Sequence, residues 1–170
     1  PGGNNRILPN DQVLIMAATE NLQHLMELTG VKRQRRHRVM ILGGGLVGSR
    51  VAKLFGKTVR VKLLEKDEKR AEELSSELKN TEILHGDGSD KIALDAAGLM
   101  DMDTFISATG ENETNIMSCL LAKHLMDTGN QNIENSPGSH IKTISLVNKE
   151  EYQVLASTSG SDIALNKKIM

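Results

Sequence analysis

Residues 38–48 read Arg-Val-Met-Ile-Leu-Gly-Gly-Gly-Leu-Val-Gly and place a glycine-rich loop between two apolar segments. Val39 to Leu42 is a short, continuous apolar run, typical of a strand buried on both faces of a parallel sheet. From Val47 onward the apolar residues recur at helical spacing, at positions 47, 51, 54 and 55. A strand, a G-x-G-x-x-G loop and a helix in this order indicate a dinucleotide-binding turn.

The three motif glycines have different expected roles. Gly43 permits a tight turn, Gly45 lets the backbone approach a pyrophosphate, and Gly48 lets the helix pack closely on the strand. The amino end of the following helix offers unpaired N–H groups and a positive dipole end to the phosphates. We therefore expect an anion to bind at this loop.

A carboxylate, Glu65, follows the second strand-like run, Val59 to Leu64. An acid roughly 20 residues after the glycines is where such folds hold the ribose hydroxyls of NAD. It also repels a 2′-phosphate, so NAD(H) is favoured over NADP(H). The alternative is a surface acid that opens a loop before Asp67, a plausible helix cap.

Strand-like and helix-like segments alternate from Arg38 to about Asn148, which predicts an α/β fold with a doubly wound parallel sheet. The later strands are expected at 82–85, 104–108 and 141–147. Four further helices are expected. The first is capped by Asp67 and has an apolar face at 71, 74 and 78, and the second is a short helix that runs from a Ser89 cap to Gly98. The third spans 113–126, and the fourth begins at Asn148 and Glu151.

Two turns after later strands lie at the same predicted sheet edge as the glycine loop. They are Gly86-Asp87-Gly88 and Ala108-Thr109-Gly110, the second followed by Glu111, Asn112, Glu113 and Asn115. Ligands of open α/β sheets bind outside the carboxyl ends of the strands. The alternative is an ordinary turn aspartate and a capped helix start.

The flanking regions do not continue the alternation. In 1–31, a strand-like run at 11–16 and a helix-like run at 20–29 cannot bury a core alone, so they read as the tail of a preceding domain. Residues 32–37 form a basic linker, with an anion or nucleic-acid patch as the alternative. The polar segment 127–140 is a long loop. The segment 157–170 has little to bury locally and suits a crossover onto a partner subunit.

Composition excludes several classes of function. The net charge is −1, aromatic residues make up 2% of the chain, and there is one cysteine. This balance argues against a nucleic-acid surface, a disulfide framework and a cysteine-rich metal site, and no apolar run is long enough to span a bilayer. Tyr152 lacks a lysine four residues on, Cys119 reads as a core thiol, and the histidines are scattered. No catalytic or metal-binding residue is predicted.

Five motifs in order resemble the nucleotide-binding half of an RCK (KTN) domain. They are Gly-Gly-Gly-Leu-Val-Gly, Leu-Leu-Glu-Lys-Asp, His-Gly-Asp-Gly-Ser, Ala-Thr-Gly-Glu-Asn-Glu-Thr-Asn-Ile-Met and Leu-Val-Asn-Lys-Glu-Glu-Tyr. The resemblance implies a Rossmann-like domain of the RCK N-terminal type at 38–170. It also implies that 1–31 is the last strand and helix of a preceding RCK C-terminal subdomain.

The resemblance further implies a site and a role. Gly43, Gly44, Gly45, Leu46, Val47 and Gly48 would form the pyrophosphate turn, and Glu65 would hold the adenosine ribose. Asp87 and Gly88 would flank the adenine, with Thr109 and Asn148 at the distal end, where some members carry an arginine at position 148. The ligand would be NAD(H), with ATP or ADP as alternatives.

As an RCK-like regulator, the chain would not be an enzyme. It would lie in the cytoplasm at the inner face of the membrane, bound to a membrane-embedded potassium-translocating subunit. Homo-oligomers would form through the Rossmann domains, using helix 113–126 and the segment 149–170. The alternatives are an excised fragment of an NAD-dependent oxidoreductase and a nucleic-acid-binding redox sensor that uses the basic run.

Overall fold

The computed structural model describes residues 37–129 and 141–166, together with positions 6, 8, 17–21, 24, 25 and 28. The chain divides into two units, 1–35 and 36–170. In the first unit, Thr19–Asn21 is a 3₁₀ helix, η1, and positions 24, 25 and 28 are helical. The strand expected at 11–16 and most of the helix expected at 20–29 lie outside the described residues.

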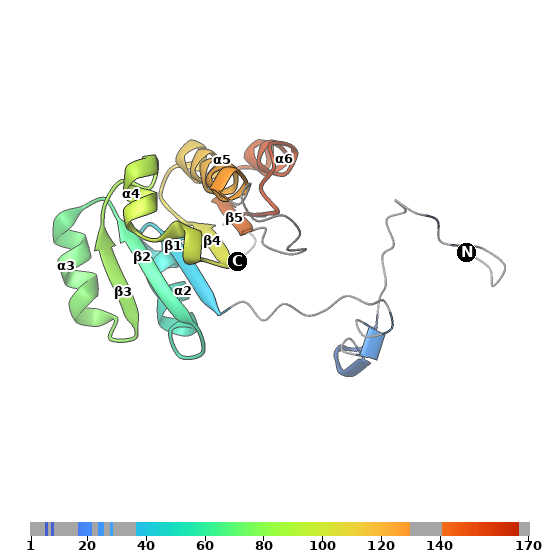
Figure 1. Cartoon of the computed structure of the whole chain (residues 1–170), viewed down its shortest axis with the longest axis horizontal. Helices are drawn as coiled ribbons and strands as arrows, with labels where there is room; N and C mark the ends of the chain where they lie inside the picture. The colour runs from blue at the N-terminus through green and yellow to red at the C-terminus, as the bar shows by residue number, and fades with distance from the viewer. Residues whose placement is uncertain are drawn as a thin grey trace. The chain divides into compact units, whose positions relative to one another are not determined.

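Six strands in the second unit form one parallel sheet (Figure 1). They are β1 (Arg38–Leu42), β2 (Arg60–Glu65), β3 (Thr81–His85), β4 (Thr104–Ser107), β5 (Lys142–Val147) and β6 (Ile163–Asn166). Their order is β3-β2-β1-β4-β5-β6, and every neighbouring pair is parallel. The chain thus reverses its direction of progress across the sheet between β1 and β4. The predicted doubly wound, Rossmann-like fold is confirmed.

Helices cover both faces of the sheet (Figure 1). They are α2 (Leu46–Phe55), α3 (Glu68–Glu77), α4 (Lys91–Ala96), η2 (Leu99–Asp101), α5 (Asn112–Gly129) and α6 (Glu150–Thr158). On one face Ala52 of α2 and Leu74 of α3 pack against alternate residues of β1 and β2. On the other face Leu94 of α4 and Cys119 of α5 join the opposite set of strand residues. The sheet is therefore buried on both sides at its centre, as the continuous apolar strands require.

The predicted helix ends are partly confirmed. Asp67 caps α3 by accepting a hydrogen bond from the Arg70 N–H, and Gly98 follows α4 with a left-handed backbone, φ 77°. Ser89 and Asn148 are not caps, so these two predictions are wrong. Asp90 caps α4 instead, since its side chain reaches the Ile92 N–H, and Lys149 precedes α6 without a side-chain cap.

Two other predictions need correction. Residues 163–166 add a strand to the sheet beside β5 and bury Ala164 against α6, so this stretch does have local partners. The expectation of little to bury is wrong there, and 167–170 lie outside the described residues. In α2, Leu54 and Phe55 are 63% and 41% exposed, because the helix packs on the sheet through Val51 and Ala52 instead.

Candidate functional site

A cleft of about 510 Å³ lies at the carboxyl edge of the sheet, where the strand order reverses between β1 and β4. Four loops line it: 43–45 after β1, 65–67 after β2, 87–89 after β3 and 108–111 after β4, together with Leu42, Arg70 and Thr114. This reversal point is where open parallel sheets bind ligands. The cleft has the size of a small-molecule or cofactor site.

The glycine loop shapes the floor of the cleft. Gly43 has φ +96°, which only glycine adopts freely, and its N–H donates to the Leu64 carbonyl at 2.8 Å. A Cβ on Gly48 would lie 1.9 Å from the Gly43 carbonyl oxygen, so helix and loop touch there. The turn and close-packing roles predicted for Gly43 and Gly48 are confirmed.

Gly45 differs from these two glycines because a Cβ there would meet nothing within 4 Å. Gly45 is also the N-cap of α2, and no side chain caps this helix end. The first N–H groups of a helix have no partners within the helix. The α2 terminus therefore offers backbone donors and a positive dipole end beside the open space of the cleft.

Glu65 is held by two backbone donors. Its Oε2 accepts from the Gly44 N–H at 2.5 Å and its Oε1 accepts from the Asp67 N–H at 2.9 Å. Arg70, from α3, donates to the Gly44 carbonyl at 3.3 Å. The carboxylate thus both lines the cleft and ties the glycine loop to the start of α3. Its role toward a ribose stays a prediction.

An ion pair joins the loops after β2 and β3. Lys66 Nζ lies 2.7 Å from Asp87 Oδ2, and Asp87 Oδ1 accepts from the Ser89 N–H at 3.0 Å and from its hydroxyl at 2.7 Å. The hydrogen bond from Lys66, followed by those from Ser89, lowers the pKa of Asp87 to about 2. Asp87 is therefore ionised at neutral pH and already engaged by protein donors.

Asn115, in α5, holds the cleft wall after β4. Its Oδ1 accepts from the Thr109 N–H at 2.9 Å, from the Thr109 hydroxyl at 2.7 Å and from the Ser107 hydroxyl at 2.9 Å. Its Nδ2 donates to the Leu146 carbonyl at 2.7 Å. With 1% of its surface exposed, Asn115 links β4, β5 and α5 behind the cleft.

The structure brings together seven of the eleven predicted site residues. Those that line the cleft are Gly43, Gly44, Gly45, Glu65, Asp87, Gly88 and Thr109. Leu46 and Val47 stand in the first turn of α2, with Leu46 71% exposed, and Gly48 lies beneath the turn. Asn148 lies outside the cleft lining; its Oδ1 accepts from Asn112 Nδ2 at 2.7 Å and its N–H donates to Asn112 Oδ1 at 2.9 Å.

Six polar residues of the cleft lining are absent from the predicted site: Lys66, Asp67, Arg70, Ser89, Glu111 and Thr114. Of these, Asp67 and Ser89 were predicted only as helix caps, and Glu111 was named after the turn that follows the fourth strand but given no role. Lys66 and Arg70 are the cationic side chains of the cleft, and neither belongs to a spacing pattern. Their one signal in the sequence is position, because both follow Glu65 within the turn and first helical turn after β2.

Catalytic chemistry has little support in the part of the chain that the structure describes. Cys119 is buried in the core, and burial raises the pKa of its thiol to about 12. Tyr152 donates its hydroxyl to Glu113 and lies outside the cleft lining. Over the described ranges, no three His, Cys, Asp or Glu side chains cluster as a metal site, and no helix is long and apolar enough to span a bilayer.

The family model of the TrkA-N domain matches residues 39–167. The Trk system potassium uptake protein TrkA of Vibrio alginolyticus is 40% identical over 126 residues, which are 74% of this chain and 27% of that protein. Its counterpart from Halomonas elongata is 33% identical over 167 residues, 98% of this chain and 34% of that protein. The chain therefore spans about a third or less of these two relatives.

Solved structures share the fold. The TrkA-N domain of the inner membrane protein ybaL from Escherichia coli aligns with a TM-score of 0.64 at 14% identity, covering 80% of this chain and 91% of that domain. The GsuK channel bound to NAD aligns at 0.60 and 16% identity, over 79% of this chain and 22% of GsuK. GsuK bound to ADP aligns with a TM-score of 0.59 at 24% identity, covering 76% of this chain and 30% of that chain.

Proposed function

Because the chain belongs to the TrkA-N domain family, we propose that it forms a nucleotide-binding part of a regulatory subunit of a potassium uptake system. The observation that carries the proposal is the cleft, which is lined by Gly45 at the uncapped α2 terminus and by the Glu65 carboxylate. The assignment to a potassium uptake system is supported by the two Trk relatives. The expectation of a nucleotide ligand is supported by the similar folds of GsuK bound to NAD and to ADP.

The proposed ligand is NAD(H), with ATP or ADP as the alternatives. The N–H groups of residues 43–47 would bind the pyrophosphate, with Gly48 supporting the turn from below. Glu65 would accept from the adenosine ribose, and its charge would reject a 2′-phosphate. Asp87 and Gly88 would flank the adenine, and Thr109 and Asn148 would serve the distal end of the ligand.

The bonds that Glu65 and Asp87 already make imply one arrangement of the site without a ligand and another with a ligand bound. Ribose hydroxyls compete with the Gly44 N–H for Glu65 Oε2, and the adenine side competes with Lys66 for Asp87. Binding therefore exchanges protein partners for ligand partners at both carboxylates. Such an exchange would loosen the bonds that tie together the loops after β1, β2 and β3, and this is the local event that we propose for regulation.

Regulation would be a population shift. A ligand moves a gate only through its differential affinity for two arrangements of the assembly. Copies of the chain would pair through α5 and α6, which carry three exposed apolar side chains: Met117, Val154 and Leu155. The assembly would act in the cytoplasm on a membrane-embedded potassium-translocating subunit. Residues 1–31 would end a preceding RCK C-terminal subdomain, joined by the linker 32–37.

Calorimetric titration with NADH, NAD, ATP and ADP tests this proposal. We expect micromolar NADH binding that weakens roughly tenfold in Glu65→Gln, since a hydrogen bond to a charged group is lost. Glu72→Gln is the matched control, because Glu72 is an exposed acid of α3 outside the cleft lining. A preference for ATP or ADP would change the ligand and keep the site.

Two outcomes would contradict the proposal. One is the absence of binding of all four nucleotides. The other is turnover of NADH with small carbonyl acceptors, which would favour the alternative of an oxidoreductase fragment.

A further inference from the structure

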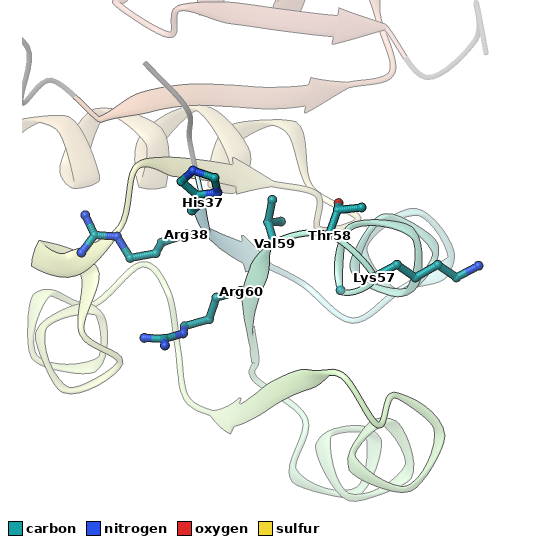
Figure 2. Close-up of a pocket in the computed structure, with 7 residues that line it drawn as sticks. His37, Arg38, Lys57, Thr58, Val59 and Arg60 are labelled. Carbon is teal, nitrogen blue, oxygen red and sulfur yellow. The ribbon is translucent and has the colours of Figure 1, made fainter. Parts of the chain in front are cut away.

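A second cavity, of about 420 Å³, lies at the amino edge of the sheet, opposite the carboxyl edge that holds the nucleotide cleft (Figure 2). The starts of β1 and β2 and the turn between α2 and β2 line it. Its lining residues are His37, Arg38, Gly56, Lys57, Thr58, Val59 and Arg60. Four of these side chains are basic, and we call them the amino-edge patch: His37, Arg38, Lys57 and Arg60.

The sheet holds this patch in place. Arg38 and Arg60 stand opposite each other in the parallel register of β1 and β2, and the Arg60 N–H donates to the His37 carbonyl at 2.8 Å. The turn is closed by the Phe55 carbonyl, which accepts from the N–H groups of Thr58 and Val59 at 2.9 Å each. These backbone bonds bring together cations that lie about 20 positions apart in the sequence.

The cations of the patch outnumber the acids that balance them. Arg38 pairs with Asp103 at 2.9 Å, which leaves this arginine anchored. Lys57 and Arg60 are exposed and form no ion pair within 37–129 and 141–166. Lys57 and Arg60 are therefore the charges of the patch that a bound anion would neutralise.

The spread of the cations suits an extended anion. Figure 2 shows Arg38 and Arg60 reaching out on the same side of the pocket, with Lys57 on the opposite side. One guanidinium group can donate two parallel hydrogen bonds to the oxygens of one phosphate, whereas a lysine ammonium acts as a point charge. The pocket lining contains no Phe, Tyr or Trp for base stacking, and its one ring is the His37 imidazole. These features favour phosphate recognition over base recognition.

We propose that the amino-edge patch is an anion-binding site for a ligand that carries two or more phosphate groups. Two sources offer this chemistry: a soluble oligophosphate and the headgroups of an anionic phospholipid surface. The patch and the nucleotide cleft lie at opposite edges of one sheet and share no lining residue. Phosphate binding at the patch is therefore independent of nucleotide binding in the cleft, and an experiment can contradict either proposal without contradicting the other.

The test is a titration of the full chain with inorganic tripolyphosphate, in which the backbone amide chemical shifts are measured at each step. We expect shifts at residues 37, 38 and 57–60, whether or not shifts also occur at the glycine loop. The double variant Lys57→Gln/Arg60→Gln should weaken binding at these amides roughly tenfold or more, because two charge-assisted contacts are lost. Its NADH affinity should remain that of the wild type.

The matched control is Lys91→Gln/Lys149→Gln, which makes the same change of charge. Both lysines are exposed, follow β3 and β5 at the carboxyl edge, and line neither cavity. This variant should bind tripolyphosphate at the patch as the wild type does. An equal loss in the control would mean that only net charge matters and would overturn the site.

Sedimentation with vesicles of phosphatidylglycerol and phosphatidylcholine separates the two sources. Vesicle binding that disappears in Lys57→Gln/Arg60→Gln identifies lipid headgroups, and tripolyphosphate binding alone identifies a soluble oligophosphate. The proposal is overturned if residues 57–60 do not respond to tripolyphosphate and vesicles do not bind. Retention of duplex DNA without either phosphate probe would also overturn it, in favour of a nucleic-acid surface.

Discussion

At the scale of single residues, the motif glycines differ in what surrounds them. Gly48 has the Gly43 carbonyl oxygen 1.9 Å from where its Cβ would stand, and Gly45 has open space. The fold thus requires a glycine at 48 and tolerates a side chain at 45. We propose that a ligand over the α2 terminus is what makes a glycine suit position 45.

The two glycines therefore provide a matched pair of variants. We expect Gly48→Ala to lower the free energy of unfolding by about 1–3 kcal/mol, since backbone must move to admit the methyl group. We expect Gly45→Ala to change it by less than about 0.5 kcal/mol and yet to weaken NADH binding. Urea unfolding and calorimetry measure the two effects. NADH affinity equal to that of the wild type in Gly45→Ala would argue against pyrophosphate binding at this loop.

Asp87 provides a prediction about pH. Its folded-state pKa of about 2, set first by Lys66 and then by Ser89, lies below the ordinary 3.8. Stability from this group is therefore complete above about pH 4 and is lost as the pH falls toward 2. A carboxyl-carbon titration should show a midpoint near 2 in the wild type and a higher one in Lys66→Gln. An ordinary midpoint in the wild type would show that the ion pair is absent in solution.

At the scale of elements, Asn115 is the residue through which α5 holds the ends of β4 and β5. Its loss leaves the Thr109 N–H and the Leu146 carbonyl without this partner. We expect Asn115→Ala to lower the free energy of unfolding by about 3 kcal/mol and to weaken NADH binding, because Thr109 lines the cleft. Chemical denaturation and calorimetry on one variant measure both.

Asn112→Ala is the comparison for that variant. Asn112 is hydrogen-bonded to Asn148, which is exposed, so water replaces the lost partner. We therefore expect Asn112→Ala to lower the free energy of unfolding by about 1 kcal/mol. Equal costs for the two asparagines would mean that the bonds behind Thr109 do not support the cleft.

At the scale of the whole molecule, α5 and α6 present an apolar surface that the described part of the chain leaves exposed. Met117, Val154 and Leu155 are 61%, 65% and 49% exposed, and Ile116 and Ala156 join the two helices beneath them. Contiguous exposed apolar patches mark contact surfaces, and the contact of α5 with α6 through Ile116 and Ala156 puts these exposed side chains on neighbouring helices. This surface is our candidate for contact between copies.

Sedimentation velocity tests this surface. We expect the wild type to self-associate and Val154→Glu to shift it toward monomer, because a buried unpaired charge is costly at an interface. Leu54→Glu, on α2, is the control, since Leu54 is 63% exposed and α2 packs on the face of the sheet opposite α5. A wild type that stays monomeric at its highest soluble concentration would remove the proposed assembly.

Much of this architecture was predictable from local patterns. The apolar run 39–42, the glycines at 43 and 48, the Asp67 cap and the Gly98 terminator each depend on residues within one turn or strand, and each is confirmed. The last strand was not predictable in the same way. Ile163–Asn166 is a four-residue strand with an alternating burial pattern, and it depends on its pairing with β5 and on the packing of Ala164 beside α6.

The amino-acid sequence alone determined the parallel sheet, the glycine turn and the carboxylate after β2, because backbone preference and apolar periodicity act over a few residues. The tertiary structure decided which groups meet: Lys66 with Asp87, Asn115 with Thr109 and the Leu146 carbonyl, and Arg38 with Asp103. These partners come from different strands and loops. Their proximity depends on sheet order and register, which the packing of the whole domain selects.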